Sequence, residues 1–201
     1  MTGPARAAAV VVVGSVNADI VVTTGRRPRP GETVVASGLR RLSGGKGGNQ
    51  AVAAARAGVG TAMVCAVGDD ADGRRLVDEL AAAGVDVGAV QVVPEPTGTA
   101  LILVTPDGEN SITVVPGANA ALAVAGPAVR LPPVTGSTIL LAQLEIPAPA
   151  LDALAGLSRS TGARLVVNLS PLPADPGAVR HLLAAADPVV VNALEAREIL
   201  G

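Results

Sequence analysis

Short apolar runs alternate with amphipathic stretches along most of the 201-residue chain. The apolar runs are rich in Val, Ile and Leu, have the length of strands and are bounded by turn residues. They predict strands at 10–13, 20–24, 61–67, 138–141, 164–168 and 188–191. The intervening stretches predict helices at 49–57, 70–83, 120–129, 148–160 and 177–185, and a further helix from 194 onward. Strands that alternate with helices are typical of a mostly parallel α/β sheet.

Two further segments depart from this alternation. Residues 99–105 and 111–115 predict a β-hairpin, because Asp107-Gly108 between two β-branched runs is a strong turn pattern. Residues 32–42 mix polar and apolar side chains and predict a half-exposed strand that leads into a glycine-rich stretch.

The length of 201 residues suits one domain, or one and a fraction, and the chain has no aromatic residue. Hydrophobic residues make up 49% of the chain and aromatic residues 0%, so the core must be built from Val, Leu, Ile and Ala. The formal net charge is −2 and no ring can stack on a base, which argues against nucleic acid as the main partner. The apolar run at 7–13 is too short to span a membrane, and we expect a buried first strand in a cytoplasmic protein.

The single cysteine and the single histidine limit the chemistry further. Cys65 cannot form an internal disulfide, and its apolar neighbours predict a buried structural thiol rather than a nucleophile. His181 has no Cys or His partner nearby in the sequence, so we expect a surface or boundary residue and no zinc site.

The glycine-rich stretch 44–50 reads GGKGGNQ and is followed directly by a helical run. Lys46 precedes Gly47 rather than Ser or Thr, which excludes a phosphate-binding P-loop. Gln50 stands where a dinucleotide-binding loop needs its third glycine. Beside the free N–H groups of a helix start, Lys46 and Asn49 predict a site for a small molecule with many hydroxyl groups. A glycine-rich turn that leads into an ordinary helix is the alternative.

Polar side chains recur directly after the predicted strands. They are Asn17, Asp19, Glu145, Asn168, Asn192 and Glu195. Ligands of parallel α/β sheets bind at the carboxyl ends of the strands, so this recurrence favours a binding site. Taken singly, each of these residues is also explained as a helix cap or a turn residue.

Taken in order, the motifs resemble those of the ribokinases within the PfkB carbohydrate kinase family. They are GSVNAD at 14–19, PGET at 30–33, GGKGGNQA at 44–51, TG at 97–98, PGAN at 116–119, QLE at 143–145 and Asn192-x-x-Glu195. The resemblance extends along essentially all 201 residues. It implies a ribokinase-like α/β fold, with a mostly parallel sheet flanked by helices and a small β lid from about 20–42 and 98–116.

The resemblance also implies roles for individual residues. Those implied to hold the hydroxyl groups of the sugar are Asn17, Asp19, Gly45, Lys46, Asn49 and Glu145. Asn192 and Glu195 are implied to lie near the phosphates of ATP, with Glu195 ordering Mg²⁺ through water. In its complete form such a protein phosphorylates D-ribose to ribose 5-phosphate, uses a monovalent cation (K⁺) and forms a homodimer through the lid.

The chain departs from the family pattern in two places. The family's catalytic base is an aspartate in a Gly-Ala-Gly-Asp segment downstream of Asn-x-x-Glu, and the 201 residues contain no such segment. Most of the adenine pocket and the K⁺ site belong to the same part of the family fold. We therefore expect a C-terminally truncated member that keeps the sugar half-site but has no catalytic base and no turnover. Ser43 replaces a residue that is often bulkier in the family, which leaves the identity of the sugar open.

Two other functions stay open at this point. The first is a non-catalytic module for sugar binding or dimerisation. The second keeps the kinase class but changes the acceptor to fructose, deoxyribose or a nucleoside.

Overall fold

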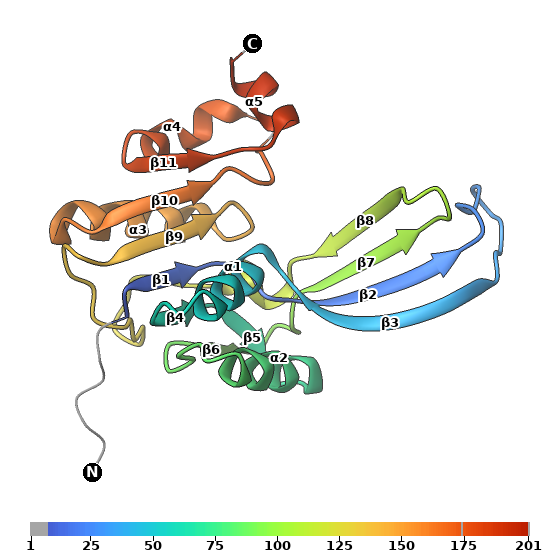
Figure 1. Ribbon diagram of the computed structural model, residues 1–201, viewed down its shortest axis with the longest axis horizontal. Coiled ribbons are helices and arrows are strands. Elements are labelled where there is room, and N and C mark those ends of the chain that lie inside the picture. Colours follow the sequence, from blue (N-terminus) through green and yellow to red (C-terminus); the bar gives the residue numbers. More distant parts are fainter. Residues whose placement is uncertain (1–7, 174, 201) are drawn as a thin grey trace.

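A parallel sheet of five strands forms the body of the computed structural model, which describes residues 8–173 and 175–200 (Figure 1). All neighbouring strands of this sheet run parallel, so their carboxyl ends lie along one edge. In spatial order the strands are β11 (Ala186–Val190), β10 (Arg164–Asn168), β9 (Ile139–Gln143), β1 (Val10–Val13) and β4 (Thr61–Val64). The predicted α/β fold with a mostly parallel sheet is confirmed.

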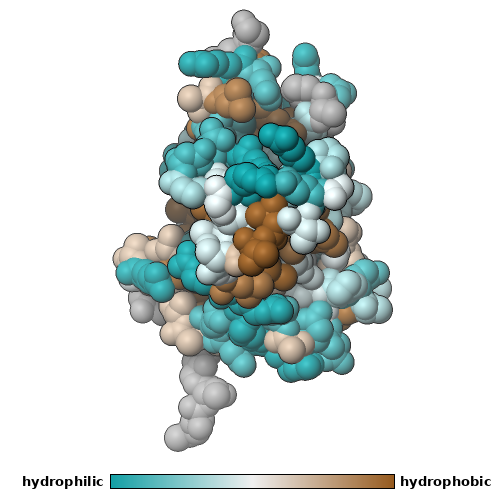
Figure 2. Space-filling view, turned by 90° about the vertical axis from the view of Figure 1, so that its right-hand side faces the viewer, coloured by the Kyte–Doolittle hydropathy of each residue, from teal (hydrophilic) through white to brown (hydrophobic). Residues whose placement is uncertain are grey.

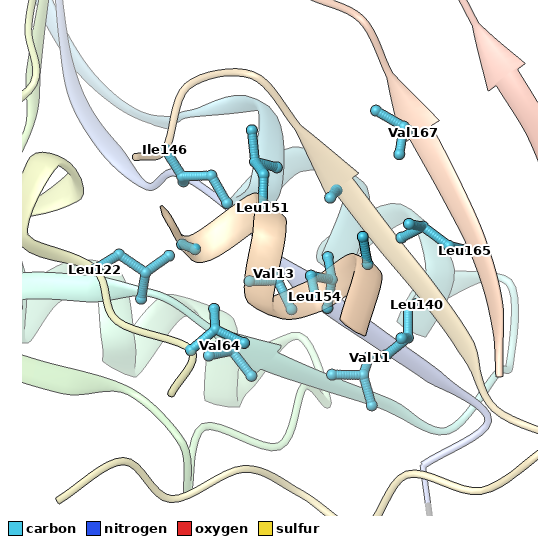
Figure 3. Packing of buried hydrophobic residues seen from close by; sticks show 14 of the residues in the cluster. Val11, Val13, Val64, Leu122, Leu140, Ile146, Leu151, Leu154, Leu165 and Val167 are labelled. Atoms are coloured by element: carbon cyan, nitrogen blue, oxygen red, sulfur yellow. The ribbon is translucent and has the colours of Figure 1, made fainter. Parts of the chain in front are cut away.

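Helices cover both faces of this sheet, because its central strands bury side chains on both sides. Val12 of β1 packs in one cluster with Leu76, whereas Val11 and Val13 pack in a second cluster with Leu154. Figure 3 shows the second cluster, in which the helix that carries Leu154 lies against the sheet. The helices are α1 (Lys46–Arg56), α2 (Ala71–Ala82), α3 (Ala148–Thr161), α4 (Arg180–Leu183) and α5 (Ala193–Leu200), with 3₁₀ turns η1 (Gly117–Ala121) and η2 (Pro176–Val179). Over the described residues, none of these helices is long and apolar enough to cross a membrane.

A second sheet of four strands projects to one side of the body (Figure 1). Its spatial order is β3 (Ala36–Gly44), β2 (Asn17–Thr24), β7 (Thr99–Val104) and β8 (Asn110–Val115). β2 runs parallel to β7, and the two outer pairs are antiparallel. A short parallel pair, β5 (Ala66–Gly68) and β6 (Gln91–Val93), completes the sheets. Since β2 follows β1 and β3 leads into α1, the four-stranded sheet joins the body at the carboxyl ends of the parallel strands.

Several predicted elements differ from the structure. The strand predicted at 61–67 is two strands, because the chain leaves the main sheet at Cys65 and then pairs with β6. The helix predicted at 120–129 is wrong, since only η1 is helical there. Leu122 and Val124 are both buried, a spacing of two that an extended chain satisfies and a helix does not. The helix predicted at 177–185 is divided between η2 and α4, and the three-residue β6 is not predicted by the pattern at all.

Candidate active site

Glu145 is the centre of a polar cluster at the carboxyl edge of the main sheet. It follows β9 directly, and its Oε2 accepts a hydrogen bond of 2.5 Å from the hydroxyl of Ser15, which follows β1. The backbone N–H of Lys46, the first residue of α1, donates to the same oxygen at 3.3 Å. The Nζ of Lys46 lies 3.4 Å from Oε1 of Glu145. A carboxylate held by a cation at a helix N-terminus is electrostatically favourable, and this contact ties α1 to β9.

Gly45 and Gly47 allow α1 to begin against the 14–16 connection. Gly45 has a φ of 83°, and a Cβ at this position would lie 2.6 Å from the Cα of Val16. A Cβ on Gly47 would lie 2.7 Å from the carbonyl oxygen of Ser15. Helix α1 therefore begins at Lys46, three residues before the predicted start at 49, and its glycines serve a backbone-to-backbone contact.

Asn17 is joined to a second buried amide, Asn119. The Nδ2 of Asn119 donates to Oδ1 of Asn17 at 2.8 Å and to the carbonyl oxygen of Val16 at 3.0 Å. The Oδ1 of Asn119 accepts from the N–H of Val16 at 3.0 Å. Asn119 is a site residue that sequence reasoning missed. It belongs to the PGAN segment of the resemblance, but that segment carries no role of its own.

Asp19 is half-buried and points its carboxylate at Gly44 of the neighbouring strand β3. A Cβ on Gly44 would lie within 2.2 Å of both carboxylate oxygens, so only glycine leaves room for them. The Oδ1 of Asp19 is buried and has no hydrogen-bond partner among the described residues. Burial, and after it the negative charge of Glu145, raises the pKa of Asp19 above its ordinary value. An acceptor left free in this way is suited to a ligand that donates hydrogen bonds.

A cavity of about 450 Å³ brings most of these side chains together. Its polar wall is formed by Ser15, Asn17, Asn119 and Glu145. Its apolar wall includes Val114 of β8, Ile146 and Pro171, so the four-stranded sheet and the main sheet both contribute to it. Of the predicted sugar-binding residues, the structure places Asn17 and Glu145 in this wall, with Lys46 and Asp19 next to them.

Asn49 and Ser43 line a different cavity, the α1–α2 hollow. Asn49 is exposed, and it lines a space of about 570 Å³ between α1 and α2 together with Ser43 and Glu79. The hydroxyl of Ser43 is hydrogen-bonded to Glu79 and, at 3.1 Å, to Arg75. The structure therefore does not bring Asn49 into the cavity that holds Asn17 and Glu145, and Ser43 connects β3 to α2.

Asn192 and Glu195 form a capping box at the start of α5. The Oδ1 of Asn192 accepts from the backbone N–H groups of Leu194 and Glu195, both at 2.9 Å. In return, Oε2 of Glu195 accepts from the N–H of Asn192 at 2.8 Å. The pair follows β11, two strands from β9 in the same parallel sheet, and so lies at the same edge as Glu145. The cap alone explains why Asn and Glu occur at these two positions, and this explanation requires no ligand.

The single cysteine and histidine agree with their predicted surroundings. Cys65 is fully buried, and burial raises the pKa of its thiol to about 12, so a reactive thiolate is not available at neutral pH. His181 lies at the surface and pairs with Asp152 of α3.

A comparison with protein families decides the relationship of the chain. Residues 7–201 match the model of the pfkB family carbohydrate kinases. This chain belongs to that family. The predicted resemblance is therefore confirmed, and the segments at 14–19, 44–51, 116–119 and 143–145, which carry part of it, supply the residues of the polar cluster described above.

Relatives in the pfkB family agree in sequence and in fold. The chain is 37% identical to the ribokinase of Bacillus subtilis (strain 168) over 83% of its own length, and 39% identical to that of Mus musculus over 84%. The crystal structure of ribokinase from Cryptococcus neoformans var. grubii serotype A in complex with ADP superimposes with a TM-score of 0.83 at 34% identity, covering 98% of this chain. Arabidopsis thaliana ribokinase complexed with ribose and ATP gives 0.77 at 32% identity over 94%.

The relatives are longer than this chain. It spans 56% of the Bacillus subtilis protein and 53% of the Mus musculus protein, and 60% and 62% of the two solved structures. The family relationship is therefore established for a chain that corresponds to little more than half of its relatives.

Proposed function

We propose that this chain carries the sugar-binding half of an ATP-dependent kinase that phosphorylates D-ribose to ribose 5-phosphate in its complete form. The observation that carries the proposal is the cavity at the carboxyl edge, whose polar wall holds Asn17, Asn119 and Glu145. The ammonium group of Lys46 contacts Glu145 beside this wall, and Asp19 nearby has a buried acceptor without a partner among the described residues. Such a set can accept from and donate to several hydroxyl groups at once. A relative of 32% identity is described as complexed with ribose and ATP.

Each sugar-binding residue has a definite role in this proposal. Asp19 accepts hydrogen bonds from hydroxyl groups through its free Oδ1, and Asn17 donates through its Nδ2. Lys46 and Glu145 act as one unit, in which the cation donates to the sugar and the carboxylate accepts from it. Gly45 sets the approach of the helix start, and Asn49 reaches the sugar only after its side chain turns away from the α1–α2 hollow.

We propose that ATP binds further along the same edge, next to Asn192 and Glu195, which follow β11. Both residues already cap α5, but Oε1 of Glu195 has no hydrogen-bond partner among the described residues. One free carboxylate oxygen fits an indirect hold on Mg²⁺ through water and is too little for a direct site. When bound, Mg²⁺ supplies charge neutralisation at the phosphates of ATP.

The 201 residues have no Gly-Ala-Gly-Asp segment, so we assign no catalytic base and no K⁺ ligand, and we expect no turnover by this chain alone.

The four-stranded sheet is the proposed lid over the sugar and the proposed homodimer contact. It supplies Val114 to the cavity wall and also carries exposed apolar residues, namely Leu39, Leu42, Leu101, Ile112 and Val115. Figure 2 shows the end of the molecule formed by this sheet, where an apolar patch is surrounded by polar surface. Exposed apolar surface of this kind favours contact with another protein surface. A sugar and ATP as substrates fit a protein of the cytoplasm.

Calorimetric titration of the chain with D-ribose tests the sugar site. We expect binding that weakens at least about tenfold in Asp19→Asn, because the free acceptor for a hydroxyl group is exchanged for an amide. Equal binding by both proteins would remove Asp19 from the site.

A coupled assay for ribose-dependent ADP formation is expected to show none, and turnover by the 201-residue chain would contradict the need for a further segment.

A nucleoside acceptor is the second candidate, because one wall of the cavity is apolar. Leu144, Ile146 and Pro147 lie beside Glu145 and offer a surface for an uncharged group attached to the sugar. Titration with inosine beside D-ribose separates the two, since a nucleoside site binds inosine more tightly and a ribose site does not. The alternative of a non-catalytic sugar-binding or dimerisation module is supported if the chain joined to a relative's C-terminal segment still fails to turn over.

A further inference from the structure

Asn119 lies at the junction between the four-stranded sheet and the body. It belongs to η1, which follows β8, and it is 2% exposed. Its side chain reaches the connection between β1 and β2, at Val16 and Asn17, which precede it by 103 and 102 positions. One side chain at the point where the chain returns to the body therefore contacts the segment where the chain first leaves the body for the four-stranded sheet.

The hydrogen bonds of Asn119 define which way the amide of Asn17 faces. The N–H of Val16 can only donate, so the Asn119 atom that meets it must be Oδ1. The other end of the Asn119 amide is then Nδ2, which donates to Oδ1 of Asn17. This leaves Nδ2 of Asn17 free of partners among the described residues, at the wall of the cavity. The N–H of Val16 thus defines the orientation of the Asn119 amide, and the Asn119 amide defines that of Asn17. As a result, Asn17 presents an N–H donor to the ligand.

Gly98 makes room for this pair of amides. It precedes β7, and a Cβ at this position would lie 2.2 Å from Nδ2 of Asn119, 2.5 Å from Oδ1 of Asn17 and 2.9 Å from the carbonyl oxygen of Pro116. Contacts this short are not found for real Cβ atoms, so a side chain at 98 would separate the two amides. The segment that leads into β7, where the chain enters the four-stranded sheet a second time, therefore also depends on glycine to leave room for this hydrogen bond.

We propose that Asn119 is a positioning residue for sugar binding, which acts by holding the amide of Asn17 with its Nδ2 toward the cavity. This proposal rests on the proposed sugar site. It assigns to the PGAN segment a role in ligand recognition: Asn119 touches no sugar itself but decides whether Asn17 donates or accepts.

Asn119→Asp is the direct test, because it keeps the size and the acceptor for Val16 but replaces the donor by an oxygen. The carboxylate then faces both Oδ1 of Asn17 and the carbonyl oxygen of Val16. Of these two acceptors only the amide of Asn17 can turn, and we expect it to present its oxygen to the cavity. Calorimetry is expected to show about a tenfold loss of D-ribose affinity, the size of one misdirected hydrogen bond. In an Asn17→Ala background the same change is expected to cost no further affinity. Equal losses in both backgrounds would overturn the proposal.

Gly98→Ala is the second variant, and it is used if circular dichroism shows that Asn119→Asp does not fold. It separates the two amides without removing either, and we expect the same loss of affinity and the same dependence on Asn17. Loss of affinity that persists in the Asn17→Ala background would show a general disturbance of the junction and contradict the proposal.

Exchange of the side-chain amide protons of Asn17, followed by NMR, tests the orientation without any ligand. The resonance is assigned by its absence in Asn17→Ala. In Asn119→Asp these protons are expected to exchange more slowly, because they then donate to a carboxylate, and unchanged exchange would overturn the proposal. If the chain does not bind D-ribose but exchange slows as expected, the sugar assignment fails while the positioning of Asn17 by Asn119 stands.

Discussion

At the scale of single residues, the two carboxylates beside the cavity differ in how they are compensated. Glu145 is held by Ser15 and Lys46, whereas Asp19 has a buried oxygen without a partner among the described residues. Burial and then the charge of Glu145 raise the pKa of Asp19, so its ionised form is less favourable in the folded protein than in the unfolded chain. This cost is what a residue kept free for a ligand is expected to show.

Asp19→Asn is therefore expected to stabilise the protein at neutral pH while it weakens sugar binding. Because the folded-state pKa of Asp19 is raised, its ionisation lowers stability as pH increases through the range just above the ordinary value of 3.8. We expect a gain of up to about 1 kcal/mol at pH 7 after allowance for solvent screening, and no gain at or below the ordinary pKa. Urea unfolding of both proteins from pH 3 to 8 measures this, and a pH-independent difference would contradict it.

At the scale of elements, side-chain caps define where helices begin, and one of them also joins a helix to the four-stranded sheet. Asp70 is the N-cap of α2: its Oδ1 accepts from the N–H of Gly73 at 2.7 Å, and its Oδ2 accepts from the N–H of Thr97 at 2.8 Å. Thr97 lies just before β7, so one carboxylate joins the start of α2 to the base of the four-stranded sheet. Asn192 and Glu195 similarly define the start of α5.

Asp70→Ala is expected to destabilise the protein by about 2 kcal/mol, because it removes a helix cap and leaves the N–H of Thr97 without its acceptor. Burial alone would raise the pKa of Asp70, but the hydrogen bonds from Thr97 and Gly73 outweigh it and lower the pKa. The stabilisation is therefore present above pH 3.8 and is lost as the pH falls through the lowered value. Thermal unfolding at pH 7 and at pH 3 measures this. Asp70→Asn, which keeps the cap but cannot serve Thr97 in the same way, is expected to be intermediate; a loss equal to that of Asp70→Ala would contradict the double role.

Glu195→Gln separates the capping role from a role at Mg²⁺. A capping box accepts Gln in place of Glu, so we expect the stability of the chain to change by less than about 0.5 kcal/mol. Joined to a relative's C-terminal segment, the same variant is expected to lose ATP-dependent turnover, because the charge near Mg²⁺ is gone. Full activity of this variant would leave the cap as the whole explanation of Glu195.

At the scale of the whole molecule, the four-stranded sheet leaves apolar side chains exposed on both of its faces. Cross-strand neighbours share a face, so Leu39 lies on one side with Val22, and Ile112 lies on the other side with Ile102. Leu39 is 63% exposed and Ile112 is 53% exposed. An apolar residue exposed on each face of one sheet favours a second protein surface against this sheet.

Replacing both residues by lysine, Leu39→Lys with Ile112→Lys, is expected to convert the proposed homodimer into a monomer. A desolvated ammonium group at a contact without a partner costs several kcal/mol, enough to disrupt a contact of this kind. Val92→Lys is the matched control, since Val92 is 66% exposed on β6, outside the four-stranded sheet. Sedimentation velocity measures the result. A dimer that survives the double change, or is lost equally in Val92→Lys, would place the contact elsewhere, and each single variant shows which face is used.

Periodicity and motif order in the sequence were sufficient for the parallel α/β fold and for the family. Both depend on local patterns: apolar runs of strand length, helical spacing, and glycines that a close backbone contact requires. The polar residues after β1 and β9 could be expected to meet, because the carboxyl ends of parallel strands share one edge. The helix predicted at 120–129 failed because burial of Leu122 and Val124, which composition does not reveal, favoured an extended chain.

Only the tertiary structure decided which polar residues act together. Asn119 is joined to Asn17 across 102 positions, and no local pattern indicates that its amide sets the direction of the other. Asn192 and Glu195 form a cap, and Asn49 lies on a separate hollow, although all three belong to the same set of motifs. Sequence determines which groups a chain can offer, because each residue type has its donors and acceptors. The packing of distant segments determines which of those groups are satisfied within the protein and which stay free for a ligand.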